Sequence, residues 1–168
     1  MITPFGKITI EVDTINAPLT AKNFLKHVSG GTFEEAVFYR TVHADNQSAG
    51  SVKLEVIQGG LFHDEKIAQH KGIFHETTKA TGLKHLDGTI SMARSEPGTA
   101  STEFFICIGE QPELDFGGKR NSDGQGFAAF GKVIHGMKVV RKIQKLPHEG
   151  QYLKQPAGIV MSIKKERQ

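Results

Sequence analysis

Histidine is the residue type most able to bring chemistry to this chain, with eight copies among 168 residues. His63, His70, His75 and His85 are scattered over segments typical of loops, and the sequence contains no His-Glu-x-x-His or Cys-x-x-Cys spacing. A zinc site needs three or four such ligands at one point, so we expect no bound metal. The sequence also lacks the Gly-x-Ser-x-Gly motif of serine hydrolases and the Gly-x-x-x-x-Gly-Lys-Ser/Thr motif of nucleotide-binding loops. These absences disfavour nucleophilic, metal and nucleotide chemistry.

Two further segments carry reactive residue types. The single cysteine, Cys107, stands in the apolar run 104–108, and apolar surroundings raise the pKa of a thiol. We therefore interpret it as a buried, inert side chain. The run Gly-Gly-Lys-Arg at 117–120 resembles a phosphate-binding loop in composition, but it lacks the spacing and a following helix. We interpret it as part of a glycine-rich surface loop over 117–126.

Length and composition point to one globular domain over residues 1–168. The chain is 38% hydrophobic and 23% charged, close to the averages of globular proteins. Its apolar runs are far shorter than the ~20 residues that span a membrane.

The net charge of +3 is spread along the sequence, and we interpret the basic end at 164–167 as a solvated tail rather than a nucleic-acid arm. No secretory signal pattern is visible, which favours the cytoplasm, with the periplasm as the alternative if a signal peptide has been removed.

Two segments have the periodicity of amphipathic helices. Residues 20–28 place apolar side chains at i, i+3, i+4 and i+7 and are followed by a glycine pair. A second apolar stripe begins at Met137, after a His-Gly turn, and continues through Val139, Val140 and Ile143.

Strand patterns dominate the remainder. Ile8, Ile10 and Val12 alternate with polar residues, as in a half-buried strand. Further strands are predicted at 36–43, 52–58, 88–93, 103–108, 127–134 and 159–164. Few connections offer the crossover helix that a parallel sheet needs, so we expect a mainly β protein whose antiparallel sheet closes into a barrel with helices over its ends.

Five sequence blocks resemble the cyclophilin family, and they occur in the order typical of that family. They are FYR at 38–40, QGGLF at 58–62, GTISMAR at 88–94, EFFI at 103–106 and FAAFGKV at 127–133, the last being similar to the bacterial branch. The resemblance covers nearly the whole chain. It implies a closed eight-stranded antiparallel β-barrel capped by two α-helices, with a proline-binding groove on its outer surface.

The function implied by the resemblance is peptidyl-prolyl cis-trans isomerisation in support of protein folding. Its substrates would be proline-containing peptides and unfolded or folded protein clients, and it would act as a monomer without a cofactor. Amide resonance gives a rotation barrier of about 18–20 kcal/mol. In the twisted state the prolyl nitrogen has a localised lone pair, so a cation that donates a hydrogen bond to it lowers the barrier.

The resemblance also implies a set of site residues. Arg40 would supply the donor, since a guanidinium stays charged and presents a fixed fork of N–H groups. Gln58 would hold Arg40 and contact the substrate backbone. Phe105 would floor the proline pocket, and Ala93 and Arg94 would bind an extended peptide through main-chain groups. The remaining predicted lining residues are Val56, Glu103, Leu114 and Phe127.

Strand phase gives an independent reason for the placement of Phe105. In a strand, alternate side chains face opposite sides. We therefore expect one face to carry Glu103, Phe105 and Cys107, and the other to carry Phe104, Ile106 and Ile108. One phenylalanine can then enter the core while its neighbour faces the groove.

The sequence departs from the family pattern at several points. The connection between Arg40 and Gln58 is about ten residues longer than usual, and alignment places Glu55 where the family has a pocket phenylalanine. Glu103 replaces the common glutamine, which leaves an acceptor without a donor, and pairing with Arg40 or Arg94 is open to it. Phe127 stands at the place of a eukaryotic histidine. Glu113 falls near the family's tryptophan, so we expect no tight binding of cyclosporin-class drugs.

Two alternatives remain open on the sequence alone. The first is a cyclophilin-fold protein that binds or holds peptides with weak or no isomerase activity. The long connection, Glu103 and the missing pocket phenylalanine support it, and Arg40 argues against it. The second is an unrelated barrel that carries a small ligand, as lipocalins do. A carrier needs a hollow interior, whereas the predicted inward positions of this chain are occupied by bulky Phe, Ile and Val side chains.

Overall fold

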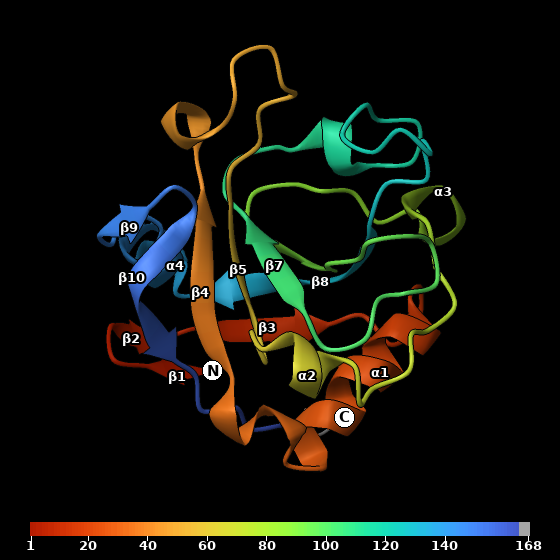
Figure 1. The fold of residues 1–168 in the computed structure, drawn as a ribbon. Coiled ribbons are helices and arrows are strands. Elements are labelled where there is room, and N and C mark those ends of the chain that lie inside the picture. Colours follow the sequence, from red (N-terminus) through yellow and green to blue (C-terminus); the bar gives the residue numbers. More distant parts are fainter. Residues whose placement is uncertain (165–168) are drawn as a thin grey trace.

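The computed structural model describes residues 1–164, and the end of the predicted basic tail lies outside these residues. Its main feature is an eight-stranded antiparallel sheet (Figure 1). The strands are β3 (Thr9–Val12), β4 (Val37–Val42), β5 (Val56–Gly60), β6 (Thr89–Met92), β7 (Phe104–Cys107), β8 (Ala128–His135), β9 (His148–Glu149) and β10 (Tyr152–Gly158). They are ordered β3-β8-β6-β7-β5-β4-β10-β9, and β1 (Ile2–Thr3) and β2 (Gly6–Lys7) form a separate hairpin. The prediction of a mainly β, antiparallel, eight-stranded protein is confirmed.

In the described part of the chain four α-helices accompany the sheet, and the two longer ones are those that the sequence predicts. They are α1 (Pro18–Ser29) and α4 (Met137–Gln144), while α2 (Asp64–Ile67) and α3 (Thr78–Thr81) are single turns. A proline at the first helical position favours the start of α1, because its fixed φ suits a helix. Helix α1 lies near β8, and α4 lies near β4 and β5. Three short 3₁₀ turns are η1 (Thr32–Glu35), η2 (Ala44–Asn46) and η3 (Pro112–Leu114).

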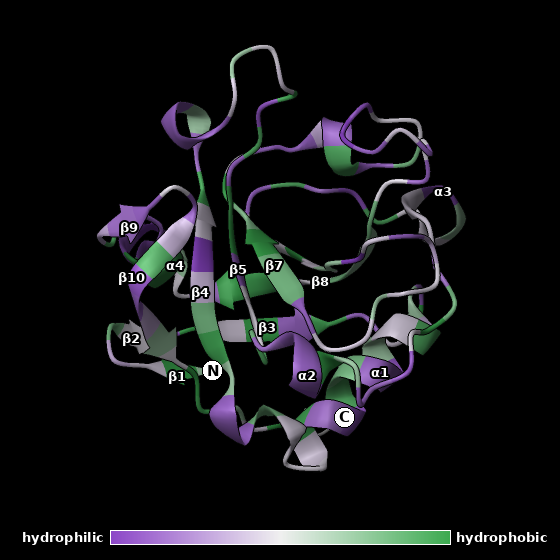
Figure 2. Cartoon of the chain, in the orientation of Figure 1, coloured by the Kyte–Doolittle hydropathy of each residue, from purple (hydrophilic) through white to green (hydrophobic). Residues whose placement is uncertain are grey.

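The main core is filled by aromatic rings. Phe38, Phe104 and Phe130 are fully buried, and Phe24 from α1 packs against the last two with ring centroids 5.5 and 5.0 Å away. Figure 2 shows the corresponding hydrophobic stretches of β7 and β8 in green. A small-ligand carrier would need open space here, so the packing disfavours that alternative.

Strand β7 separates two apolar clusters, as its phase predicts. Phe104 and Ile106 belong to the main core, whereas Phe105 and Cys107 belong to a second cluster on the other face. The second cluster also contains Val56, and it forms the apolar base of the site described below.

The last predicted strand, at 159–164, is wrong. Within residues 1–164 the final strand is β10, and beyond it Val160 forms an isolated bridge with Ile2. Strand β10 carries Pro156 among polar residues and has a register shift between Tyr152 and Ala157. A proline in such a run argues against a strand, which explains why β10 is not predicted from the sequence. Strand β5 also begins at Val56 rather than at 52, because residues 43–55 form a loop.

Candidate active site

A hollow of about 250 Å³ opens on the face of β7 that carries Phe105. The structure brings all the predicted site residues except Glu103 to its lining, namely Arg40, Val56, Gln58, Ala93, Arg94, Phe105, Leu114 and Phe127. Strands β4, β5 and β7 supply four of these residues, η3 supplies Leu114, and the other three lie just after β6 or just before β8, so no single segment of the sequence builds the hollow. Its floor is apolar and its rim carries guanidinium and amide groups.

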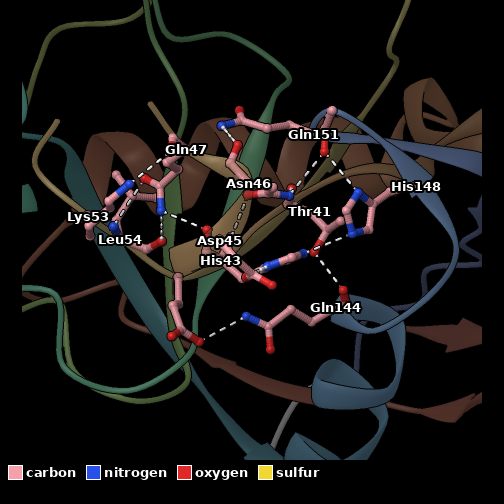
Figure 3. A network of polar contacts seen from close by, with 12 residues as sticks. Thr41, His43, Asp45, Asn46, Gln47, Lys53, Leu54, Gln144, His148 and Gln151 are labelled. Carbon is pink, nitrogen blue, oxygen red and sulfur yellow. Dashed lines mark hydrogen bonds and ion pairs between the residues drawn. The ribbon is translucent and has the colours of Figure 1, made fainter. Parts of the chain in front are cut away.

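Arg40 is held by two glutamines. Cross-strand pairing in β4 and β5 places Arg40 opposite Gln58, and its Nη1 donates to Gln58 Oε1 at 2.8 Å. Its Nε donates to Gln151 Oε1 at 3.0 Å, and its Nη2 donates to the same oxygen. Gln151 in turn donates from Nε2 to the Asn46 carbonyl at 3.2 Å (Figure 3). The long connection, through Asn46, therefore contributes to the position of Arg40.

The orientation of the Gln58 amide is fixed by Tyr39. Gln58 Nε2 donates to the Tyr39 hydroxyl at 2.7 Å, and that hydroxyl donates to Glu103 Oε2 at 2.6 Å. Burial, followed by the negative charge of Glu103, raises the pKa of Tyr39, so its hydroxyl stays protonated. A continuous chain of hydrogen bonds thus connects a buried carboxylate with the guanidinium of Arg40.

Glu103 lies behind the hollow rather than in it. Pairing with Arg40 or Arg94 does not occur, since its carboxylate accepts instead from Tyr39, from the Leu61 backbone N–H at 2.7 Å and from the Thr102 hydroxyl at 3.2 Å. This close packing explains one glycine of the QGGLF block. A Cβ on Gly60 would lie 2.3 Å from Glu103 Oε1, and its φ of 145° also favours glycine.

The floor of the hollow is supported from below by a buried polar network. Phe105 meets Phe127 edge-on, with centroids 5.3 Å apart, and stacks on His85 at 6.0 Å. His85 Nδ1 lies 2.8 Å from Asp115 Oδ1, and its Nε2 lies 2.9 Å from Ser91 Oγ. Burial alone would raise the pKa of Asp115, but the hydrogen bonds and charge of His85 outweigh it and lower that pKa. The network fixes the ring on which Phe105 rests.

The expected position of Glu55 at the pocket wall is wrong. Its carboxylate accepts from Gln144 Nε2 at 3.0 Å, and Glu55 is not among the residues that line the hollow. The wall residue is Leu54, which is 7% exposed and packs with Val42 and Val56. The side-chain amide of Gln47 donates to the Leu54 carbonyl and accepts from the Leu54 backbone N–H. These two hydrogen bonds hold Leu54 in place although it lies before the start of β5.

The glycine-rich loop contributes more than the sequence indicates. Arg94 anchors it, because its guanidinium donates to both oxygens of Asp123, at 2.8 and 2.9 Å, and to the Gly126 carbonyl. Arg120 and Asn121, which sequence reasoning missed, also line the hollow. Arg120 Nη1 donates to the Val52 carbonyl at 3.2 Å. Partial burial, and then the charge of Arg40, lower the pKa of Arg120.

The part of the chain that the structure describes contains no group of three or more His, Cys, Asp or Glu side chains placed as metal ligands. Within the same residues, every helix is too short or too polar to cross a membrane.

The antiparallel β fold and the arginine at the rim of an apolar surface hollow are the features that the sequence resemblance to cyclophilins implies. The family model for cyclophilin type peptidyl-prolyl cis-trans isomerases matches residues 1–164. The chain therefore belongs to the cyclophilin family, which confirms the resemblance seen in its sequence blocks.

Individual relatives agree with this assignment. The chain is 32% identical over 150 residues to peptidyl-prolyl cis-trans isomerase A of Dickeya dadantii, covering 89% of this chain and 72% of that protein. It is 33% identical over 145 residues to peptidyl-prolyl cis-trans isomerase B of Escherichia coli, covering 84% and 80%. A crystal structure of a cyclophilin type isomerase from Cryptosporidium parvum superposes with a TM-score of 0.72 at 22% identity, covering 95% and 91%, and supports the fold. That protein has also been crystallised in the presence of the dipeptide Ala-Pro.

Proposed function

We propose that this protein is a peptidyl-prolyl cis-trans isomerase that rotates X-Pro bonds at the hollow, with Arg40 as its catalytic residue. The observation that carries the proposal is the position of Arg40, fixed by Gln58 and Gln151 at the rim of a hollow whose floor is Phe105. A guanidinium held in this way is ready to donate before substrate arrives, so little reorganisation is needed during rotation.

The chemistry requires no covalent intermediate. As the X-Pro bond twists, conjugation is lost and the prolyl nitrogen becomes a hydrogen-bond acceptor. A donor from Arg40 interacts with that nitrogen in the twisted state and with neither planar isomer. Such differential binding lowers the barrier rather than merely tightening substrate binding.

The remaining lining residues have binding roles in this proposal. The proline ring packs on Phe105, with Val56, Leu114 and Phe127 around it. Gln58 and the main chain of Ala93 and Arg94 hold the flanking peptide in an extended form. Glu103, for which the sequence predicts substrate contact, acts indirectly through Tyr39 and Gln58.

Finer features of the molecule belong to the same proposal. We propose that the sheet closes into a barrel and that the chain is a single domain and a monomer. The support for closure is that Ile8, beside β3, and Leu153 of β10 pack in one core cluster although their strands lie near opposite ends of the sheet order. In this proposal the substrates of the protein are proline-containing peptides and protein clients. The protein acts in the cytoplasm or, as the alternative, in the periplasm.

The experiment compares isomerisation of an Ala-Pro peptide by NMR exchange with wild type and with Arg40→Ala. We expect kcat/KM to fall about 100-fold, as for loss of one transition-state donor, with most of the loss in kcat. Arg141→Ala is a matched control, since Arg141 lies on α4 and pairs with Asp87 at a distance from the hollow. Equal rates for wild type and Arg40→Ala would contradict the proposal.

The second candidate function is peptide holding with little turnover. It is favoured by the Asn46-containing connection and by Glu103, the two departures from the family pattern near Arg40. Peptide binding by wild type, seen as NMR shift changes, without accelerated exchange would support this function instead.

A further inference from the structure

Arg120 brings a second guanidinium into the hollow that holds Arg40. Its one side-chain hydrogen bond among the described residues goes to the Val52 carbonyl, which is uncharged. Neither Arg40 nor Arg120 forms an ion pair within residues 1–164. The rim of the hollow therefore carries two positive charges that no carboxylate of the described chain neutralises.

The acidic residues on the surrounding segments are engaged elsewhere. Glu113 Oε2 accepts from the Lys119 backbone N–H at 2.7 Å. Asp123 pairs with Arg94, and Glu55 accepts from Gln144. None of these three carboxylates forms an ion pair with Arg40 or Arg120.

A second observation at the same place is an unused hydrogen-bond donor. Asn121, which follows Arg120 and lines the same hollow, has a buried Nδ2 with no acceptor within residues 1–164, the single such side-chain atom there. A buried donor without an acceptor costs about 1–3 kcal/mol, so these atoms are rarely left in folded proteins without a reason. Because this atom has almost no exposed surface, an incoming acceptor would satisfy it after a rotation of the Asn121 side chain that turns Nδ2 towards the hollow.

We propose that Arg120 and Asn121 form an anion subsite that selects substrates with an acidic side chain next to the proline. A carboxylate has acceptor capacity for both a guanidinium N–H and an amide N–H, and charge-assisted hydrogen bonds are the stronger kind. Arg40 donates to Gln58 and Gln151 and is assigned to the prolyl nitrogen with its remaining N–H groups, so Arg120 is the guanidinium available to a substrate side chain. This inference rests on the proposed isomerase function and specifies its substrate class.

The proximity of the two arginines gives a physical reason for the preference. The charge of Arg40 disfavours the cationic form of Arg120, in addition to partial burial. A substrate carboxylate between or beside them removes part of that repulsion, and a neutral side chain of the same shape does not.

The test uses peptide pairs that differ only in charge: Ala-Glu-Pro-Ala against Ala-Gln-Pro-Ala, and Ala-Ala-Pro-Glu against Ala-Ala-Pro-Gln, with blocked termini. We expect kcat/KM of the glutamate peptide to exceed that of its glutamine partner about five- to tenfold in at least one pair at low salt. The ratio should decrease at 0.5 M NaCl, because screening weakens a partly exposed pair. Ratios near one in both pairs would overturn the proposal.

Variants locate the effect. Arg120→Gln removes the charge at similar length and is expected to bring the ratio to about one. Lys119→Gln makes the same charge change at the neighbouring, exposed position and should keep the wild-type ratio. Asn121→Asp places a negative charge in the subsite and should lower the ratio. A preference that persists in Arg120→Gln would assign it to other residues and overturn the proposal.

Failure of this inference is distinguishable from failure of the proposed function. If wild type accelerates exchange of both peptides of each pair equally, the isomerase function stands and the anion subsite does not. If it accelerates neither, the isomerase function fails. In that case NMR titration, which gives the ratio of the dissociation constants of the glutamate and glutamine peptides, tests the subsite by itself.

Discussion

Arg40 can act as a fixed donor only while Gln58 presents its carbonyl oxygen to it. An amide side chain can turn over and exchange its oxygen for its NH₂ group, which would point donors at a guanidinium that has no acceptor. The Tyr39 hydroxyl prevents this, because it accepts from Gln58 Nε2 while its own proton is held by Glu103. The buried carboxylate thereby sets the direction of every hydrogen bond up to Arg40.

Tyr39→Phe tests this chain with little change in shape. We expect kcat/KM for Ala-Pro peptides to fall about fivefold, mainly through kcat, because removal of the hydroxyl breaks its hydrogen bonds to Gln58 and Glu103, and loss of the first, worth roughly 1 kcal/mol, releases the Gln58 amide. Tyr152→Phe is the control, since Tyr152 is 55% exposed and pairs with Arg40 only through β10 backbone register. NMR exchange rates measure both variants. An unaltered rate in Tyr39→Phe would mean that Gln58 needs no such restraint.

Sequence predicted the site residues that lie on strands better than those that lie on loops. Arg40 and Gln58 lie opposite each other in the β4–β5 ladder, so the strand pairing alone fixes their relative position. Leu54, Arg120 and Gln151 reach the site from loops, where side-chain position depends on tertiary hydrogen bonds that no periodicity encodes.

At the scale of elements, the start of α1 depends on a residue far along the chain. Ala17 at the N-cap offers no side-chain acceptor to the first N–H groups of the helix. Glu76 supplies the acceptors instead, taking bonds from the Leu19 and Thr20 backbone N–H groups at 3.2 and 2.7 Å, and from the Thr20 hydroxyl at 2.6 Å. Its carboxylate also suits the positive end of the helix dipole. The cap ties the α2–α3 segment to α1.

Glu76→Ala should therefore destabilise the protein although Glu76 is distant from the hollow. We expect the free energy of unfolding to fall by about 2 kcal/mol, since a capping acceptor is lost and buried donors are left unsatisfied. Glu110→Ala, at an exposed position whose carboxylate has no hydrogen-bond partner within residues 1–164, serves as the matched control and should change the free energy of unfolding by less than about 0.5 kcal/mol. Denaturant titration followed by circular dichroism gives both values. Equal stabilities of the two variants would show that water caps α1 equally well.

The elements themselves were predictable where periodicity was strong. The predicted helix 20–28 became Pro18–Ser29, and the alternation of β7 placed Phe104 and Phe105 correctly on opposite faces. The single turns α2 and α3 are too short to show a period. Strand β10 was missed because only Leu153 and Ala157 of its residues are buried, so it lacks regular alternation.

At the scale of the whole molecule, the sheet joins segments from both halves of the chain. Strand β3 pairs with β8, and β4 pairs with β10, so the first and last thirds of the sequence are interleaved (Figure 1). Strand β7 lies between β5 and β6, well away from either end of the sheet order. The strands at each end of the chain thus pair with strands distant in the sequence, which favours unfolding in one cooperative step.

Cys107 on β7 provides a probe of that cooperativity. It is the single cysteine of the sequence and is fully buried, and burial, followed by the charges of Asp115 and Asp87, raises the pKa of its thiol. We expect labelling by a thiol reagent at pH 8 to be at least about a thousandfold slower than in the unfolded chain, because exposure requires global opening. The opening free energy from labelling should equal that from circular dichroism, with the same denaturant slope. Labelling with a smaller opening free energy and a shallower slope would instead identify a local opening of β7, and the single cooperative unit would be wrong.

The same thiol predicts a pH dependence of stability. Because its pKa is higher in the folded than in the unfolded state, the free energy of unfolding should decrease as pH rises past about 8.5. Cys107→Ala should remove that part of the decrease.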